Sequence, residues 1–140
     1  MKTTPTSDLV SNTFNRQDAE SAIRAMFDAG CAAWNRGDLD NYLASYWDSD
    51  QTLWISGGKL TRGLQAITAA YKARFVTPQQ MGQLTVTGLS IDVLTDVDAF
   101  AFGHWMLAID DKTLIGVFTV QVRKIDGNWL FVSDHASTSG

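Results

Sequence analysis

Residues 114–135 read LIGVFTVQVRKIDGNWLFVSDH, two runs rich in β-branched and aromatic residues that are joined by Asp126-Gly127. An Asp-Gly pair between two such runs is a strong signal for a β-hairpin, because a type I′ turn needs a positive φ at both central residues. The sequence therefore predicts two long antiparallel strands that meet at this turn.

The position of the turn also predicts the register of the two strands. If Ile125 faces Asn128, the pairs that follow are Val122 with Phe131, Val120 with Ser133, and Phe118 with His135. Cross-strand partners share one face of a sheet, so these residues form an apolar surface with two polar groups, Ser133 and His135, at one end. We expect this face to line a core or pocket, and we expect Asp134 to point away from it.

Three helices are predicted before the long strands. Asn15 can cap the first helix, whose apolar residues recur at helical spacing until Gly37 ends it. Asp38 caps a short second helix. The third helix follows Gly63, and Pro78 stops it.

The other strands surround these helices in the sequence. Residues 53–62 form a small hairpin with a Gly-Gly turn. In residues 83–95 the apolar alternation slips at Gly88, which predicts a β-bulge that bends the sheet. The order of elements favours an α+β domain in which helices cover one face of a curved antiparallel sheet.

The strand that precedes the closing hairpin is apolar on both faces. If it turns at Asp110-Asp111, Trp105 faces Gly116 and lies on the inner face, while Phe102 lies on the outer face. A three-residue loop would exchange the two faces. With the two-residue turn, the outer face carries large apolar side chains that no helix is left to cover, so we expect a homodimer through that face.

Length and charge limit the class of protein. At 140 residues the chain is one domain, which we place at residues 15–140 after a loose polar lead-in at residues 1–14. A net charge of −4 argues against nucleic acids and anionic membranes as partners. No run is apolar and long enough to span a bilayer, and the start does not read as a signal peptide, so the default location is cytoplasmic.

Several short strings resemble the nuclear transport factor 2-like superfamily, and within it the SnoaL-like branch. Their order and spacing carry the resemblance over nearly the whole chain after residue 15. The strings are AWNRGDLD at 33–40, TRG at 61–63 with Ala66-Ile67, GHW at 103–105, DGNW at 126–129 and DHAS at 134–137.

The resemblance implies a cone-like sheet wrapped around three helices in a cystatin-like roll, with a cavity between them and frequent dimers. It also implies a choice of functions, because the superfamily includes isomerases, dehydratases, cyclases and hydrolases as well as binding and assembly modules. The chain departs from the catalytic sets of ketosteroid isomerases and scytalone dehydratases. Asp92 is expected to point outward, and His104 and His135 are expected on opposite faces.

His135 is the best candidate for chemistry from sequence, as a general base with a pKa near neutrality. The alternative is a histidine that is only half-buried and bonded to the backbone. Tyr46 or Tyr71 is the candidate hydrogen-bond donor that would act with it. The residues expected to contact a ligand are Trp54, Arg62, Tyr71, Trp105, Phe118, Phe131 and Ser133. Of these, Arg62 could hold an anionic ligand or simply pair with a surface acid.

No metal or other cofactor is expected, because two histidines, one cysteine and a single glutamate do not fall at ligand spacing. Cys31 lies on the buried stripe of the first helix and is expected to be an inert thiol. Two functions remain open. The first is proton transfer on a small apolar ligand, of the isomerase, dehydratase or cyclase type. The second is a non-catalytic dimeric module for binding or scaffolding.

Overall fold

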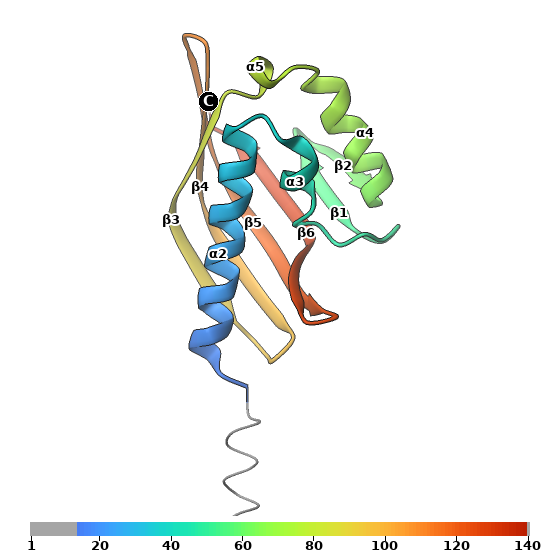
Figure 1. Ribbon diagram of the computed structural model, residues 1–140, viewed down its shortest axis with the longest axis vertical. Helices are drawn as coiled ribbons and strands as arrows, with labels where there is room; N and C mark the ends of the chain where they lie inside the picture. The colour runs from blue at the N-terminus through green and yellow to red at the C-terminus, as the bar shows by residue number, and fades with distance from the viewer. Residues whose placement is uncertain (1–13, 140) are drawn as a thin grey trace, which may run out of the picture.

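The computed structural model describes residues 14–139 and places four helices and one six-stranded sheet in that range (Figure 1). The helices are α2 (Arg16–Asn35), α3 (Leu39–Leu43), α4 (Leu64–Arg74) and α5 (Pro78–Met81). The strands are β1 (Leu53–Ser56), β2 (Lys59–Arg62), β3 (Gln83–Val93), β4 (Asp98–Ile109), β5 (Lys112–Ile125) and β6 (Asn128–Thr138). The predicted lead-in, residues 1–14, lies outside the described range except for Phe14.

The helix boundaries follow the capping signals. The side chain of Asn15 accepts a hydrogen bond from the Asp18 N–H at 3.1 Å, and that of Asp38 accepts from the Asn41 N–H at 3.1 Å. Gly37 ends α2 with a φ of 76°, and a Cβ there would lie 2.5 Å from Pro78. Both caps and the stop are confirmed. In the described range, none of the helices combines the length and apolarity that crossing a bilayer requires.

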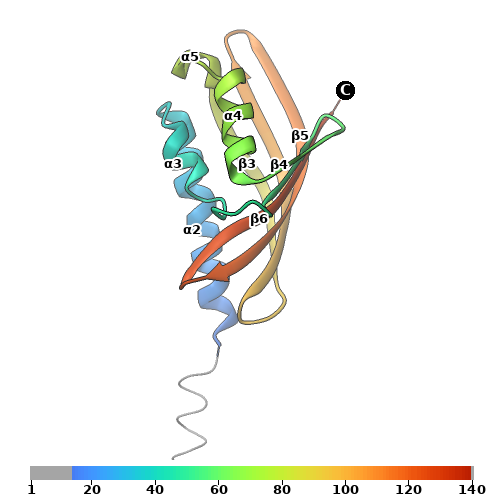
Figure 2. The same ribbon diagram turned by 90° about the vertical axis from the view of Figure 1, so that its right-hand side faces the viewer.

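The sheet has the strand order β2-β1-β6-β5-β4-β3, and it curves around α2, α3 and α4, which all lie on its concave side (Figure 2). This arrangement confirms the α+β class and the curved sheet. The sheet is mixed, because β1 pairs in parallel with β6, a pairing that the sequence does not indicate. The short helix α5 was also not predicted, since Pro78 was interpreted only as the end of the preceding helix.

The register of β3 and β4 agrees with the sequence. Thr87 pairs with His104 and Ser90 with Phe102, so two residues on β3 oppose one on β4, and the bulge at Gly88 is confirmed. Ile109 pairs with Lys112 across the two-residue turn, which confirms that Trp105 faces Gly116.

The outer side of the sheet is apolar over β4 and β5. Five side chains there have relative exposures from 37% to 49%, namely Phe100, Phe102, Met106, Ile115 and Val117. We call these five residues the outer apolar face. The helices lie on the opposite side of the sheet and leave this face open (Figure 2).

The closing hairpin departs from the predicted register. Its turn at Asp126-Gly127 and the pair of Val122 with Phe131 are as predicted. Val132 is then an extra residue in β6, so the later pairs are Gln121 with Ser133, Val120 with Asp134, and Thr119 with His135. The predicted pairs Val120–Ser133 and Phe118–His135 are wrong.

The physical reason is a bulge between two buried neighbours. Phe131 and Val132 are consecutive and only 7% and 8% exposed, whereas a regular strand with one covered face buries only alternate side chains. The extra residue shifts the alternation by one position. Every later side chain of β6 therefore moves to the other face of the sheet.

Candidate functional site

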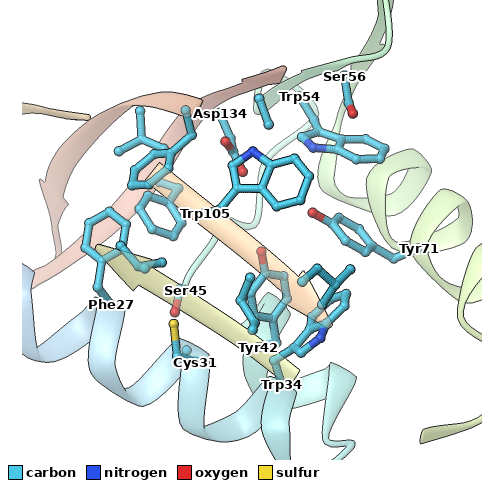
Figure 3. Close-up of a pocket in the computed structure, with 18 of the residues that line it drawn as sticks. Phe27, Cys31, Trp34, Tyr42, Ser45, Trp54, Ser56, Tyr71, Trp105 and Asp134 are labelled. Atoms are coloured by element: carbon cyan, nitrogen blue, oxygen red, sulfur yellow. The ribbon is translucent and has the colours of Figure 1, made fainter. Parts of the chain in front are cut away.

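A cavity of about 180 Å³ lies between the concave face of the sheet and the helices (Figure 3). Its wall is mainly apolar and rich in rings. The aromatic lining residues are Phe27, Trp34, Tyr42, Trp54, Tyr71, Phe75, Trp105, Phe118 and Phe131. Mostly apolar walls with a few polar groups are typical of small-molecule sites.

Asp134 supplies the carboxyl group of this cavity. It lies on β6 between Trp54 of β1 and Val120 of β5, and the bulge at Val132 directs it inward. Among the described residues that line the cavity, it is the only carboxylic acid. Figure 3 shows its side chain among the aromatic residues that line the cavity.

Tyr46, which lies outside the cavity lining, donates a hydrogen bond to this carboxyl. The Trp47 N–H donates to the Phe131 carbonyl at 2.9 Å and the Phe131 N–H donates to the Ser45 carbonyl at 2.8 Å, so the segment after α3 is tied to β6. The tie brings the Tyr46 hydroxyl to Asp134, to whose Oδ2 it donates a hydrogen bond. Tyr46 is only 3% exposed and does not line the cavity itself.

The surroundings of Asp134 raise the pKa of its carboxyl toward neutral pH. Burial raises the pKa of Asp134 from 3.8 to about 6, while the hydrogen bond from Tyr46 and the charge of His135 act in the opposite direction. The residue is partly accessible because the cavity reaches it, yet the protein around the carboxyl removes it from bulk water. A carboxyl with such a pKa can both accept and return a proton near neutral pH.

Two tyrosine hydroxyls share the cavity with Asp134. Burial, followed by the negative charge of Asp134, raises the pKa of Tyr42 to about 12. Burial also raises the pKa of Tyr71 well above 10, with smaller contributions from Tyr42 and Asp134. Both hydroxyls are therefore protonated at neutral pH and can donate hydrogen bonds to a ligand.

The rings hold these hydroxyls in place. Tyr71 stacks on Trp54, with ring centroids 4.8 Å apart, and meets Tyr42 edge-on at 5.7 Å. Trp105 donates from its Nε1 to the Ser137 carbonyl at 3.2 Å and lies against Gly116, where a Cβ would be 2.7 Å from the indole. The absence of a side chain at Gly116 thus lets the Trp105 ring lie over the sheet.

The cavity also contains a thiol. Cys31 lines it from α2, and burial followed by the charge of Asp28 raises the pKa of that thiol. It is therefore protonated and a weak nucleophile at neutral pH, in line with the inert thiol expected from sequence. Among residues 14–139, no three or more side chains of His, Cys, Asp and Glu are grouped so that they could hold a metal ion.

The structure brings five of the sequence-derived ligand contacts together on the cavity wall: Trp54, Tyr71, Trp105, Phe118 and Phe131. It does not bring His135, Ser133 or Arg62 there. His135 and Ser133 pair with the outward-facing Thr119 and Gln121, because the bulge reverses their faces. Arg62 is exposed and donates to the Gln51 Oε1 at 3.1 Å. The predicted inward position of His135 is therefore wrong.

Asp134 was predicted from sequence to point away from the cavity, and its neighbour His135 was predicted in its place. A signal was present in the apolar run Leu130-Phe131-Val132, which breaks the alternation that a regular strand requires. After such a break, Asp134, Ala136 and Thr138 continue the inward phase, and all three line the cavity. Tyr42 was interpreted only as part of a helical stripe.

Comparison with known proteins agrees with this architecture. The SnoaL-like domain family matches residues 23–139. An NTF-2-like protein of unknown function from Shewanella oneidensis MR-1 is 37% identical, covers 85% of this chain and 98% of its own, and superposes with a TM-score of 0.82. No curated protein matches the chain.

Two more distant structures show the fold alone. A putative scytalone dehydratase from Novosphingobium aromaticivorans DSM 12444 is 14% identical, with a TM-score of 0.70 over 89% of this chain and 86% of its own. A putative calcium/calmodulin dependent protein kinase II association domain from Xanthomonas campestris is 17% identical, with a TM-score of 0.67 over 84% of this chain and 85% of its own. The family match and the 37% identical relative show that the chain belongs to the SnoaL-like domain family of the nuclear transport factor 2-like superfamily.

Proposed function

We propose that this protein binds a small, largely apolar molecule in the cavity and exchanges a proton with it through Asp134. The observation that carries the proposal is the half-buried carboxyl of Asp134, with a pKa of about 6, in a cavity walled by aromatic rings. A carboxyl whose pKa lies near the working pH, inside a mostly apolar pocket, is typical of a general acid–base group.

The proton transfer would use three groups. The Asp134 carboxylate would take a proton from a carbon next to a carbonyl group of the ligand. The electron pair of that C–H bond would form a carbon–carbon double bond, and the π pair of the carbonyl group would move onto its oxygen, which would accept a hydrogen bond from the protonated Tyr42 or Tyr71. Asp134 would then return the proton to carbon, so the enzyme ends in its starting state.

Tyr46 would act on Asp134 and not on the ligand. Its hydroxyl donates to the Asp134 Oδ2, and Asp134 lines the cavity, so the other carboxyl oxygen would act on the ligand. Tyr46 is therefore a positioning residue in this proposal. This role differs from direct donation to the ligand, which was expected from sequence.

The size of the cavity limits the ligand. An engineered apolar cavity of about 150 Å³ binds benzene. The cavity here, at about 180 Å³, is slightly larger. The proposed ligand is thus a molecule of about one ring, and a fused multi-ring compound would need the cavity to open.

The test follows deuterium exchange at the carbons beside the carbonyl of cyclohexanone, in D₂O at pD 7.5, by NMR. The wild-type protein should accelerate exchange at least about tenfold over Asp134→Asn, since general-base groups typically contribute 10²–10⁴-fold on their own substrates. His135→Asn is the matched control, because it changes the neighbouring residue on the opposite face of the sheet. Equal exchange by the wild type and Asp134→Asn would overturn the proposal.

A second candidate is a non-catalytic dimeric module for binding or scaffolding. The observation that favours it is the outer apolar face, which is open to a partner. The exchange assay separates the two functions, because a module without catalysis would bind small rings in the cavity without any acceleration that depends on Asp134.

A further inference from the structure

We infer that the ligand carries an anionic group, such as a carboxylate, which Arg74 holds at the opening of the cavity. The inference rests on the proposed function, in that a small molecule occupies the cavity, and it adds the charge and the orientation of that molecule.

Arg74 is the cationic side chain among the described residues that line the cavity. It is the last residue of α4 and is exposed, so it lies where the cavity meets solvent. Its guanidinium lies 5.1 Å from the ring centroid of Phe75, which also lines the cavity. Stacking on an aromatic ring holds a guanidinium in a preferred plane while its N–H groups stay available.

Among residues 14–139, no acid forms an ion pair with Arg74. Within the described residues, the ion pairs join other cations to acids, and Arg74 takes part in none of them. Lys72 lies in the same last turn of α4 but is 3.7 Å from the Asp40 carboxylate. In a chain with a net charge of −4, a guanidinium without an acid partner at a cavity opening is a place of positive potential.

Asp134 sets the direction in which such a ligand would enter. Asp134 is half-buried and bonded to the buried Tyr46, whereas Arg74 is exposed, so the cavity is acidic inside and basic at its opening. An anionic group would be repelled from the interior and attracted to the guanidinium, whose planar fork matches a carboxylate. The apolar part of the ligand would then lie inside, beside Asp134 and the tyrosine hydroxyls.

The test compares three one-ring probes by isothermal titration calorimetry at pH 7.5: benzoate, benzyl alcohol and benzylamine. They share a ring and differ in charge. The wild-type protein should bind benzoate at least about fivefold more tightly than benzyl alcohol. A preference for benzylamine, or equal affinity for benzoate and benzyl alcohol, would overturn the inference.

Two variants assign the preference to Arg74. Arg74→Gln should abolish the benzoate preference and leave the affinity for benzyl alcohol within about twofold of the wild type. Lys72→Gln, the matched control from the same helical turn, should keep the preference. An unchanged benzoate preference in Arg74→Gln would contradict the role of Arg74. If benzyl alcohol binds without a benzoate preference, only this inference fails; if no probe binds, the proposed ligand cavity fails as well.

Discussion

Asp134 is subject to two opposing effects at the scale of a single residue. Burial raises its pKa to about 6, and the hydrogen bond from Tyr46 works against that rise. Since the ordinary pKa of the group is 3.8, the folded chain holds this proton more tightly than the unfolded chain does. The ionised form of Asp134 is therefore a source of instability, which is a common property of residues placed for chemistry.

Asp134→Asn should change how stability depends on pH. A raised carboxyl pKa stabilises the fold fully below pH 4, and this contribution is lost as the pH rises through about 6. A shift from 3.8 to about 6 corresponds to at most about 3 kcal/mol. Between pH 4 and pH 7 the wild type should therefore lose up to that amount of unfolding free energy relative to Asp134→Asn. Urea denaturation of both proteins at each pH measures the difference, and parallel pH profiles would contradict it.

Tyr46→Phe should raise the pKa of Asp134 further. The variant removes the hydrogen bond that favours the charged carboxylate and leaves the ring in place. Carbon-13 NMR of the labelled aspartate carboxyl, followed against pH, gives the midpoint directly. Tyr42→Phe is the control, since it removes a hydroxyl from the cavity without removing the hydrogen bond to Asp134. A lower or unchanged midpoint in Tyr46→Phe would show that Tyr46 does not hold the carboxylate.

At the scale of elements, the bulge in β6 decides which chemistry the cavity contains. Without the extra residue Val132, β6 would continue the register of its first half and direct His135 inward. With it, Asp134 and Ala136 face the cavity, and His135 lies outside. One inserted residue thus places the carboxyl of Asp134 in the cavity instead of the imidazole of His135.

Gly116→Ala tests how closely β4, β5 and β6 fit together below the cavity. A Cβ at Gly116 would lie 1.9 Å from the Ser137 carbonyl oxygen and 2.7 Å from the Trp105 ring, so one of them must move. We expect an unfolding free energy lower by about 2 kcal/mol, as for other overpacked sites. Thr119→Val, on the exposed side of β5, is the control and should change little. Urea denaturation measures the unfolding free energy of both variants. An unchanged value for Gly116→Ala would show that the strands can accommodate a Cβ at this position.

At the scale of the whole molecule, the sheet has two apolar faces and only one set of helices. The concave face packs on α2, α3 and α4, whereas the outer apolar face is open (Figure 2). An apolar face of this kind on a monomer usually marks an interaction surface. We therefore retain the homodimer through this face as a proposal.

Phe102→Asp should give a monomer if the proposal is right. Phe102 is 43% exposed within the outer apolar face, and a carboxylate there would lose its water on dimerisation. Light scattering after size exclusion should show a dimer for the wild type and half that mass for the variant. Val76→Asp, an apolar residue 72% exposed away from the sheet, is the control and should remain dimeric. An unchanged mass for Phe102→Asp would contradict the assignment.

Much of the fold was determined by local sequence, because caps, turns and bulges depend on nearby residues. Asn15 and Asp38 begin their helices through hydrogen bonds to residues three positions on, and Gly37 ends α2. The turns at Asp110-Asp111 and Asp126-Gly127 followed in the same way and placed Trp105, Phe118 and Phe131 on the inner face. The parallel pairing of β1 with β6 joins segments far apart in the chain and has no such local signal.

The chemistry of the cavity was decided only by the tertiary structure. Whether Asp134 or His135 faces inward depends on the bulge at Val132, which forms because Phe131 and Val132 both find a buried place. The contact of Tyr46 with Asp134 likewise requires the segment after α3 to be tied to β6. The sequence alone determined a curved sheet with helices on one face and aromatic residues on its inner side. Long-range packing selected its acid, because alternation along a strand reverses with a single inserted residue.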